Sequence, residues 1–128
     1  MLRRLLKRNA GRREWNREHR RAWVGMSEIS GSGLTHFQIQ CEAAITRALN
    51  DMGLQLTARE LDDASFIKAR IADTEWTLWI YPDAAEVISS RSTLVRLEEW
   101  DAKTPADFFA QFISRMVSGV GQQISTSV

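Results

Sequence analysis

Two segments of the chain carry apolar residues at the spacing of an α-helix. The first begins after Thr35, and Gln38 three residues later completes a capping-box pattern. Gly53 follows the last apolar position and is a residue that commonly ends helices. The pattern therefore predicts an amphipathic helix between Thr35 and Gly53. Its apolar stripe consists of Phe37, Cys41, Ala44, Ile45, Ala48, Leu49 and Met52.

The second helical segment follows Thr104, which we interpret as an N-cap. Pro105 stands at the first helical position, and Asp107 lies in the first turn, where a negative charge suits the helix dipole. Gly119 and Gly121 are expected to end this helix, which leaves residues 119–128 as a polar, frayed tail. The apolar stripe consists of Phe108, Phe109, Phe112, Ile113, Met116, Val117 and Val120.

Between the two helices the apolar residues alternate with polar residues, which is typical of half-buried strands. Phe66–Ile71 and Trp76–Tyr81 are predicted to form a hairpin through the tight connection Asp73-Thr74. A third strand is expected near Glu86–Ser89. Leu94–Glu98 is either a fourth strand or the continuation of the third strand beyond a bulge.

The order of elements predicts an α+β fold in one domain, residues 34–118, consistent with a chain of 128 residues. It consists of a helix, a three- or four-stranded antiparallel meander and a second helix, with both helices on one face of the sheet. Thr57 and Glu60 repeat a capping pattern, so a short helical turn is expected at about residues 58–63.

The net charge of +1 conceals an uneven distribution along the chain. Residues 1–25 form a basic arm, with nine Lys and Arg against Glu14 and Glu18, a net charge of +7. Residues 26–128 carry eight basic against fourteen acidic residues, a net charge of −6, so the core is acidic. Gly31-Ser32-Gly33 suggests that residues 26–33 are a flexible linker.

Trp15, His19 and Trp23 recur every four residues in the arm, so an amphipathic helix is expected at about residues 12–24. Arginine-rich helices with interleaved aromatic residues bind RNA, and they also bind anionic membrane surfaces. The arginines that would contact nucleic acid are Arg12, Arg13, Arg17, Arg20 and Arg21.

Two other interpretations of the arm stay open at this point. The arm could fold against the acidic core and place Trp15 and Trp23 on Trp79 and Tyr81, since the two parts carry opposite charges. Alternatively, it could be the product of an over-long reading frame, with Met26 as the native start.

The face of the sheet that the helices do not cover is the most informative feature for function. If Ile67, Leu78 and Ile80 point toward the helices, aromatic and basic side chains gather on the opposite face. Such a face is typical of a binding surface for bases, sugars or a protein, or of a face covered within the chain or by a second subunit. Its members are Phe66, Lys68, Arg70, Thr77, Trp79, Tyr81 and Arg96.

Catalytic and metal chemistry finds little support in the residues. Cys41, the sole cysteine, lies on an apolar stripe and is expected to be a buried structural thiol. One cysteine with the two distant histidines His19 and His36 gives no zinc ligand set. The acidic clusters Asp62-Asp63 and Glu98-Glu99-Asp101 are expected to be solvated ends of elements. We therefore expect no enzyme, cofactor or metal.

The residues favour a small non-enzymatic interaction domain of the adaptor, chaperone-like or immunity type. It would bind a protein partner or itself through Phe66, Lys68, Arg70, Trp79, Tyr81 and Arg96. RNA binding through the arginines of the arm is the alternative. No apolar run is long enough to span a membrane, and one cysteine suits a reducing compartment, so we expect a cytoplasmic protein.

Overall fold

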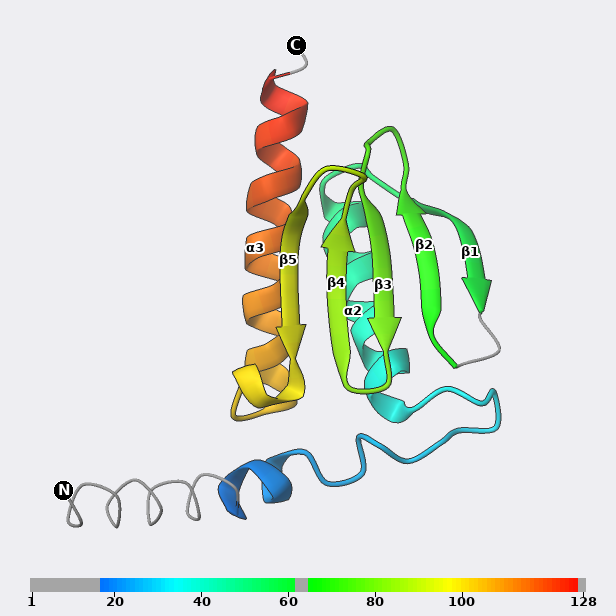
Figure 1. Ribbon diagram of the computed structural model, residues 1–128, viewed down its shortest axis with the longest axis vertical. Helices are drawn as coiled ribbons and strands as arrows, with labels where there is room; N and C mark the ends of the chain where they lie inside the picture. Colours follow the sequence, from blue (N-terminus) through cyan, green and yellow to red (C-terminus); the bar gives the residue numbers. More distant parts are fainter. Residues whose placement is uncertain (1–16, 62–64, 127–128) are drawn as a thin grey trace, which may run out of the picture.

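A helix, a five-stranded antiparallel sheet and a second helix follow one another in the computed structural model (Figure 1). The structure describes residues 17–61 and 65–126. The strands are neighbours in sequence order, which makes the sheet a simple meander. The elements are α2 (His36–Asp51), β1 (Leu56–Leu61), β2 (Ile67–Ile71), β3 (Thr77–Tyr81), β4 (Ala84–Ile88), β5 (Thr93–Glu98), the short 3-10 helix η1 (Glu99–Asp101) and α3 (Pro105–Thr126).

The predicted α+β order is confirmed, but the predicted three or four strands are wrong because β1 was interpreted as a helical turn at residues 58–63. Thr57 pairs with Arg70, and Glu60 pairs with Lys68, in an antiparallel ladder with β2. A bulge interrupts this register between Thr57 and Glu60, where Ala58 has a φ of 52°. Pairing with β2 therefore outweighs the local capping pattern.

The other predicted strands are present with shifted bounds. The third predicted strand begins earlier than expected, at Ala84, because Pro82-Asp83 is a two-residue connection after β3. Leu94–Glu98 belongs to a separate strand, β5, which a turn over residues 89–92 joins to β4. In this turn the backbone N–H of Ser89 donates to the carbonyl of Ser92 at 2.8 Å.

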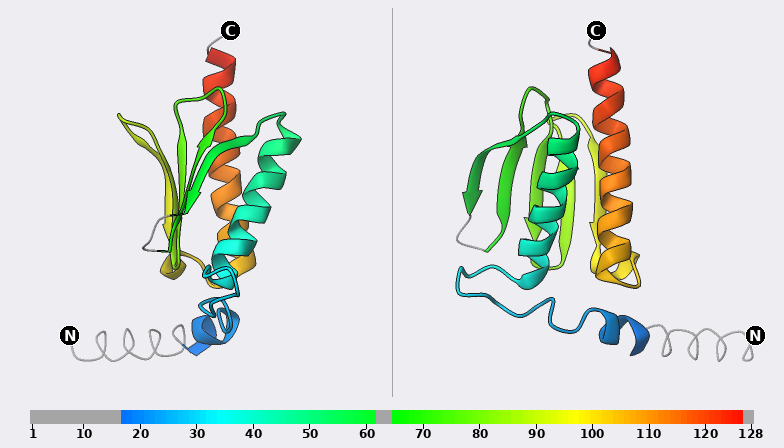
Figure 2. Two further views of the ribbon diagram at one scale, coloured as in Figure 1. Left: turned by 90° about the vertical axis from the view of Figure 1, so that its right-hand side faces the viewer. Right: turned by 180° about the vertical axis from the view of Figure 1, so that it is seen from behind.

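Both helices contact the sheet, α2 through β3 and α3 through β5, and they contact each other. Figure 2 shows them on the same side of the sheet, as the alternation of apolar residues predicted. The side chains that point toward the helices are buried in one core with the apolar stripes of α2 and α3. They include Ile67, Ile71, Leu78, Ile80, Val87, Val95 and Leu97.

The capping box predicted at the start of α2 is present and also ties the helix to the sheet. The backbone N–H of Gln38 donates to Thr35 Oγ1 at 3.2 Å, and the N–H of Thr35 donates to Gln38 Oε1 at 2.9 Å. The amide nitrogen of the fully buried Gln38 donates to the carbonyls of Ser65 and Ile80, the latter at 3.2 Å. One side chain thus satisfies groups from α2, β3 and the segment before β2.

The helix α3 begins as predicted, since the N–H of Asp107 donates to Thr104 Oγ1 at 3.1 Å. The predicted end at Gly119 is wrong, because α3 continues through both glycines to Thr126. Gly119 instead allows a close approach to β5. A Cβ atom there would lie 2.0 Å from Leu94 Cδ1, whereas one at Gly121 would lie no closer than 3.9 Å to any neighbour.

Residues 17–22 are helical, and this turn is joined to the core by two buried side chains. Trp23 Nε1 donates to the carbonyl of Ala102 at 3.2 Å, and His19 Nε2 donates to the carbonyl of Glu99 at 2.8 Å. The Trp23 ring also contacts the rings of Phe37 and Phe108, with centroids 5.7 and 5.8 Å away. Residues 19–23 thus complete one end of the core.

The segment expected to be a flexible linker makes regular backbone hydrogen bonds. The N–H of Phe37 donates to Met26 O at 3.0 Å, and the N–H of His36 donates to Glu28 O at 3.0 Å. Ile29 forms an isolated bridge with Thr35. These contacts hold residues 26–35 across the end of the molecule where α2 begins (Figures 1 and 2). No helix among the described residues is long and apolar enough to cross a membrane.

The placement of Trp23 predicts a large effect of one substitution in the arm. Trp23→Ala removes a buried aromatic side chain, and we expect it to lower the free energy of unfolding by about 3–5 kcal/mol. Val24→Ala is the matched control, because Val24 is 76% exposed and its loss should change the value by no more than about 0.5 kcal/mol. Urea unfolding of the full chain measures both. Equal effects would contradict the placement of Trp23 in the core.

Candidate interaction surface on the open face of the sheet

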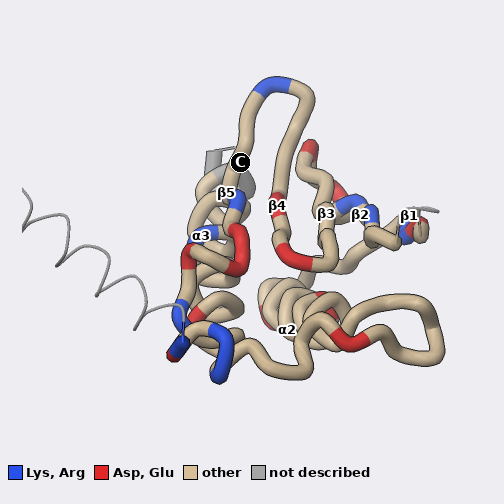
Figure 3. The backbone as a smooth tube through the Cα atoms, turned by 60° about the horizontal axis from the view of Figure 1, so that its bottom comes forward, with Lys and Arg blue, Asp and Glu red and all other residues tan. Residues whose placement is uncertain are grey.

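One row of side chains crosses the open face of the sheet from edge to edge. The strand registers place Glu60 opposite Lys68, Lys68 opposite Trp79, Trp79 opposite Glu86, and Glu86 opposite Arg96. Directly paired residues of antiparallel strands lie on the same face, so all five point away from the helices. We call this set the charged row. Figure 3 shows its basic positions on β2 and β5 and its acidic position on β4.

Three aromatic rings lie together on the same face. The centroid of Phe66 is 5.4 Å from that of Trp79 and 5.6 Å from that of Tyr81, and Trp79 stacks on Tyr81 at 6.3 Å. Lys68 Nζ lies 5.1 Å from the centroid of Trp79, a cation–π geometry. All three rings are half-buried although neither α2 nor α3 covers them, because they cover one another.

Glu86 connects the aromatic rings to the basic side of the face. Its Oε1 accepts a hydrogen bond from the Tyr81 hydroxyl at 2.6 Å, and its Oε2 accepts one from Arg96 Nη1 at 2.7 Å. Arg96 also reaches Glu98, with 3.5 Å between Nη2 and Oε1. Both oxygens of a buried carboxylate are thereby satisfied. Burial raises the pKa of Tyr81 to about 12, and the hydrogen bond to Glu86 acts in the same direction.

The structure brings together most of the residues predicted for a binding face. Phe66, Lys68, Trp79, Tyr81 and Arg96 form one connected group with Glu86, which we call the open-face cluster. Arg70 and Thr77 lie on the same face, paired with each other one row farther along the strands. The guanidinium of Arg70 points away from the open-face cluster, because its Nη2 donates to the carbonyl of Thr74 in the hairpin at 3.3 Å.

Sequence reasoning missed two residues of this surface. Glu60 was missed because β1 was interpreted as a helical turn. The second is Glu86. It lies in the segment AAEVI, which carries no local sign that its carboxylate has two partners. A signal was available in the spacing. Glu86 and Arg96 lie on the two sides of a hairpin, and Tyr81 precedes Glu86 by five residues. The register of β3, β4 and β5 is needed to convert that spacing into contacts.

The described arginines of the arm lie outside the open-face cluster. Arg17, Arg20 and Arg21 are exposed, whereas His19 and Trp23 on the opposite side of the same turn are buried. Their turn lies beside η1, since His19 Nε2 donates to the carbonyl of Glu99. Arg12, Arg13 and Trp15 lie outside the described residues. The predicted contact of Trp23 with Trp79 and Tyr81 is wrong, because Trp23 packs on the helix side of the sheet.

The residues that could have served in catalysis have structural roles instead. Cys41 is fully buried, as predicted, and burial raises the pKa of its thiol. His36 is the first residue of α2. Asp101 Oδ2 accepts the N–H of Glu98 at 2.8 Å, and Asp62-Asp63 lies outside the described residues. Within residues 17–61 and 65–126, no three His, Cys, Asp or Glu side chains gather as a metal site would require.

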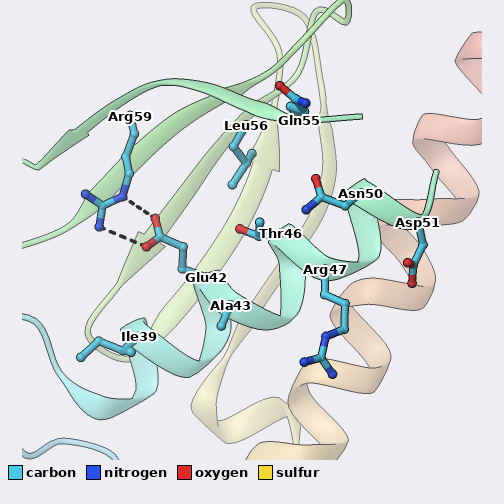
Figure 4. Close-up of a pocket in the computed structure, with 10 residues that line it drawn as sticks. All are labelled: Ile39, Glu42, Ala43, Thr46, Arg47, Asn50, Asp51, Gln55, Leu56 and Arg59. Atoms are coloured by element: carbon cyan, nitrogen blue, oxygen red, sulfur yellow. Dashed lines mark hydrogen bonds and ion pairs between the residues drawn. The ribbon is translucent and has the colours of Figure 1, made fainter. Parts of the chain in front are cut away.

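A groove of about 880 Å³ lies between α2 and the edge strand β1. Glu42 and Arg59 point toward one another across it (Figure 4). Arg59 donates from Nε to Glu42 Oε2 at 2.6 Å and from Nη2 to Oε1 at 3.0 Å, a two-pronged ion pair. The sequence analysis assigned no role to these two residues. Their ion pair links α2 to the edge strand β1.

A second cavity, of about 620 Å³, lies at the end of the molecule where residues 23–37 pass over the core. Asp83 and Glu99 line it together with Trp23 and Phe37. Of the acidic cluster Glu98-Glu99-Asp101, Glu99 alone is among the lining residues. The cavity therefore brings one member of the cluster next to a carboxylate that the sequence did not group with it.

Comparison of the chain with protein-family models, with curated proteins and with solved structures gives no match. The proposals below therefore depend on the geometry of this chain alone.

The environment of Tyr81 predicts an unusual alkaline titration. Tyr81 is the sole tyrosine, so tyrosinate absorbance reports this one hydroxyl. With a pKa of about 12, about a tenth of it should be ionised at pH 11, against about nine tenths for an ordinary tyrosine. Because folding raises this pKa, its stabilising effect is complete below about pH 10 and decreases as the pH rises from 10 to 12.

Two variants test the cause of this shift. Glu86→Gln should move the tyrosinate titration to lower pH, because the carboxylate that holds the hydroxyl proton is gone. Glu98→Gln is the control, because Glu98 contacts Arg96, whereas the Tyr81 hydroxyl donates to Glu86. Circular dichroism at each pH checks that the chain is folded. A midpoint near pH 10 in the folded parent protein would contradict the geometry.

Proposed function

We propose that the chain is a non-enzymatic interaction domain that binds a protein through the open face of its sheet. The single observation that carries this proposal is the open-face cluster. It places three aromatic side chains and two basic side chains on a face that neither helix covers. Trp, Tyr and Arg are the residues that most often dominate the binding energy of protein interfaces.

The rigidity of the cluster supports the same proposal. The rings of Phe66, Trp79 and Tyr81 contact one another, and Glu86 fixes the hydroxyl of Tyr81. Side chains that are already held in place lose little conformational entropy when a partner binds. The cations add specificity, because Lys68 and Arg96 are bound at the rings and remain partly or largely exposed at their ends.

RNA binding by the basic turn is the second candidate function, and one observation favours it. Burial of His19 and Trp23 orients the other side of the turn outward, and this side carries Arg17, Arg20 and Arg21. A fixed array of arginines is suited to phosphate contacts. Deletion of residues 1–25 is a poor test of this candidate, because it would also remove Trp23 from the core.

Site-specific photo-crosslinking in cells tests both candidates with the full chain. A photoreactive amino acid replaces Thr77 on the open face, Val24 beside the basic turn, or the exposed Ser114 on α3 as the control position. We expect a discrete protein adduct from position 77, and none from position 114. Trp79→Ser in the same chain should abolish the adduct because it removes the central ring of the cluster.

The outcomes separate the candidates. Adducts from position 77 that equal those from position 114, or that persist with Trp79→Ser in a folded chain, would contradict the proposed function. A nuclease-sensitive adduct from position 24, together with no adduct from position 77, would favour RNA binding instead.

A further inference from the structure

The charged row has a symmetry that indicates what covers the open face. From β1 to β5 its residues are acidic at Glu60, basic at Lys68, aromatic at Trp79, acidic at Glu86 and basic at Arg96. Read in the reverse direction, every charge has the opposite sign, and Trp79 stays at the centre. A surface of this kind is complementary to a second copy of itself.

We propose that the open face binds the open face of a second copy of this chain, with a two-fold axis that runs parallel to β3. This inference rests on the proposed function and names the partner. Rotation about an axis along the strands turns over the second sheet and reverses its row. Trp79 then faces Trp79 of the second copy. Lys68 faces Glu86 of the second copy, and Glu60 faces Arg96 of the second copy.

The alternative two-fold arrangement is disfavoured by the same residues. An axis perpendicular to the strands would bring each strand onto its own copy. Lys68 would then face Lys68, and Glu86 would face Glu86. Like charges across an interface cost several kcal/mol, so the row selects the axis along β3.

The neighbouring row of the face is complementary in shape under the same rotation. Tyr81 pairs with Ala84, which pairs with Glu98, and Phe66, the residue before β2, lies beside Tyr81. Reversal places the large ring of Phe66 over the small side chain of Ala84 in the second copy, on both sides of the axis. Alternation of large and small residues is how the inner faces of two packed sheets interdigitate.

The size of the face sets the strength of the expected association. Five strands at about 4.8 Å spacing and about 3.3 Å per residue give a face of roughly 19 Å by 17 Å. The area of this face, about 320 Å², is smaller than the roughly 800 Å² that each partner buries in a standard interface. We therefore expect a micromolar dimer that weakens as salt screens its four ion pairs.

Sedimentation velocity of the purified full chain tests the inference. The parent chain should change from monomer to dimer between about 1 μM and about 1 mM, with weaker association in about 500 mM than in about 50 mM NaCl. Glu60→Lys combined with Lys68→Glu keeps the net charge and the cross-strand pair within the chain. It also places like charges opposite each other in the dimer, so the dissociation constant should rise at least about tenfold.

Two further variants keep the test independent of folding. Exchange of Glu42 and Arg59 swaps an ion pair outside the open face, so dimerisation should be unchanged. Glu60→Lys alone alters an exposed edge residue and leaves the contact of Lys68 with Trp79 in place, so it should weaken the dimer in a folded chain. Dimerisation of the double variant that is as tight as in the parent chain would overturn the inference.

A parent chain that stays monomeric up to about 1 mM would also overturn it. This failure is distinguishable from failure of the proposed function. A monomeric chain that still gives an adduct with a different protein from position 77 in cells leaves the proposed function in place and removes the second copy as its partner.

Discussion

The structure depends on one constraint, which is that both helices pack on the same face of a five-stranded sheet. That face buries the apolar side chains of the strands against α2 and α3 in a single core. The other face has no element to cover it in the described part of the chain. Its side chains therefore have to satisfy one another, and the open-face cluster is the result. Aromatic rings cover each other, and Glu86 receives two hydrogen bonds that compensate for its burial.

The same constraint explains the role of the basic arm. Two helices leave the end of the core exposed where α2 and α3 begin, next to Phe37 and Phe108. Trp23 and His19 occupy this end and bond to the carbonyls of Ala102, which follows η1, and of Glu99, the first residue of η1. A chain that started at Met26 would lack both side chains and leave a hole beside the two phenylalanines. Residues 19–23 of the arm therefore have a packing function whether or not its arginines bind RNA.

The sequence predicted those parts of the fold that local patterns determine. The cap at Thr35 and Gln38, the hairpin of β2 and β3, and the burial of Cys41 follow from spacing over a few residues. β1 was missed because its local capping pattern competes with a pairing that depends on β2.

The aromatic and basic members of the candidate site were predicted, but Glu86 and the connections between the members were not. Alternation along residues 66–71 and 76–81 places Phe66, Lys68, Trp79 and Tyr81 on one face, and this required no knowledge of partners. The contacts of Glu86, and the order of charges across the sheet, depend on the register between strands. Register is fixed by burial of the whole opposite face, so no short segment encodes it.

The most direct test of the central claim, that the open face is covered by a second copy, is hydroxyl-radical footprinting of the purified full chain over a range of concentrations. Trp79 lies at the proposed axis, and Trp100, which is 53% exposed at the end of the molecule, is an internal control. The account predicts that oxidation of Trp79 decreases relative to oxidation of Trp100 as the concentration rises. A ratio that is the same at every concentration would contradict it.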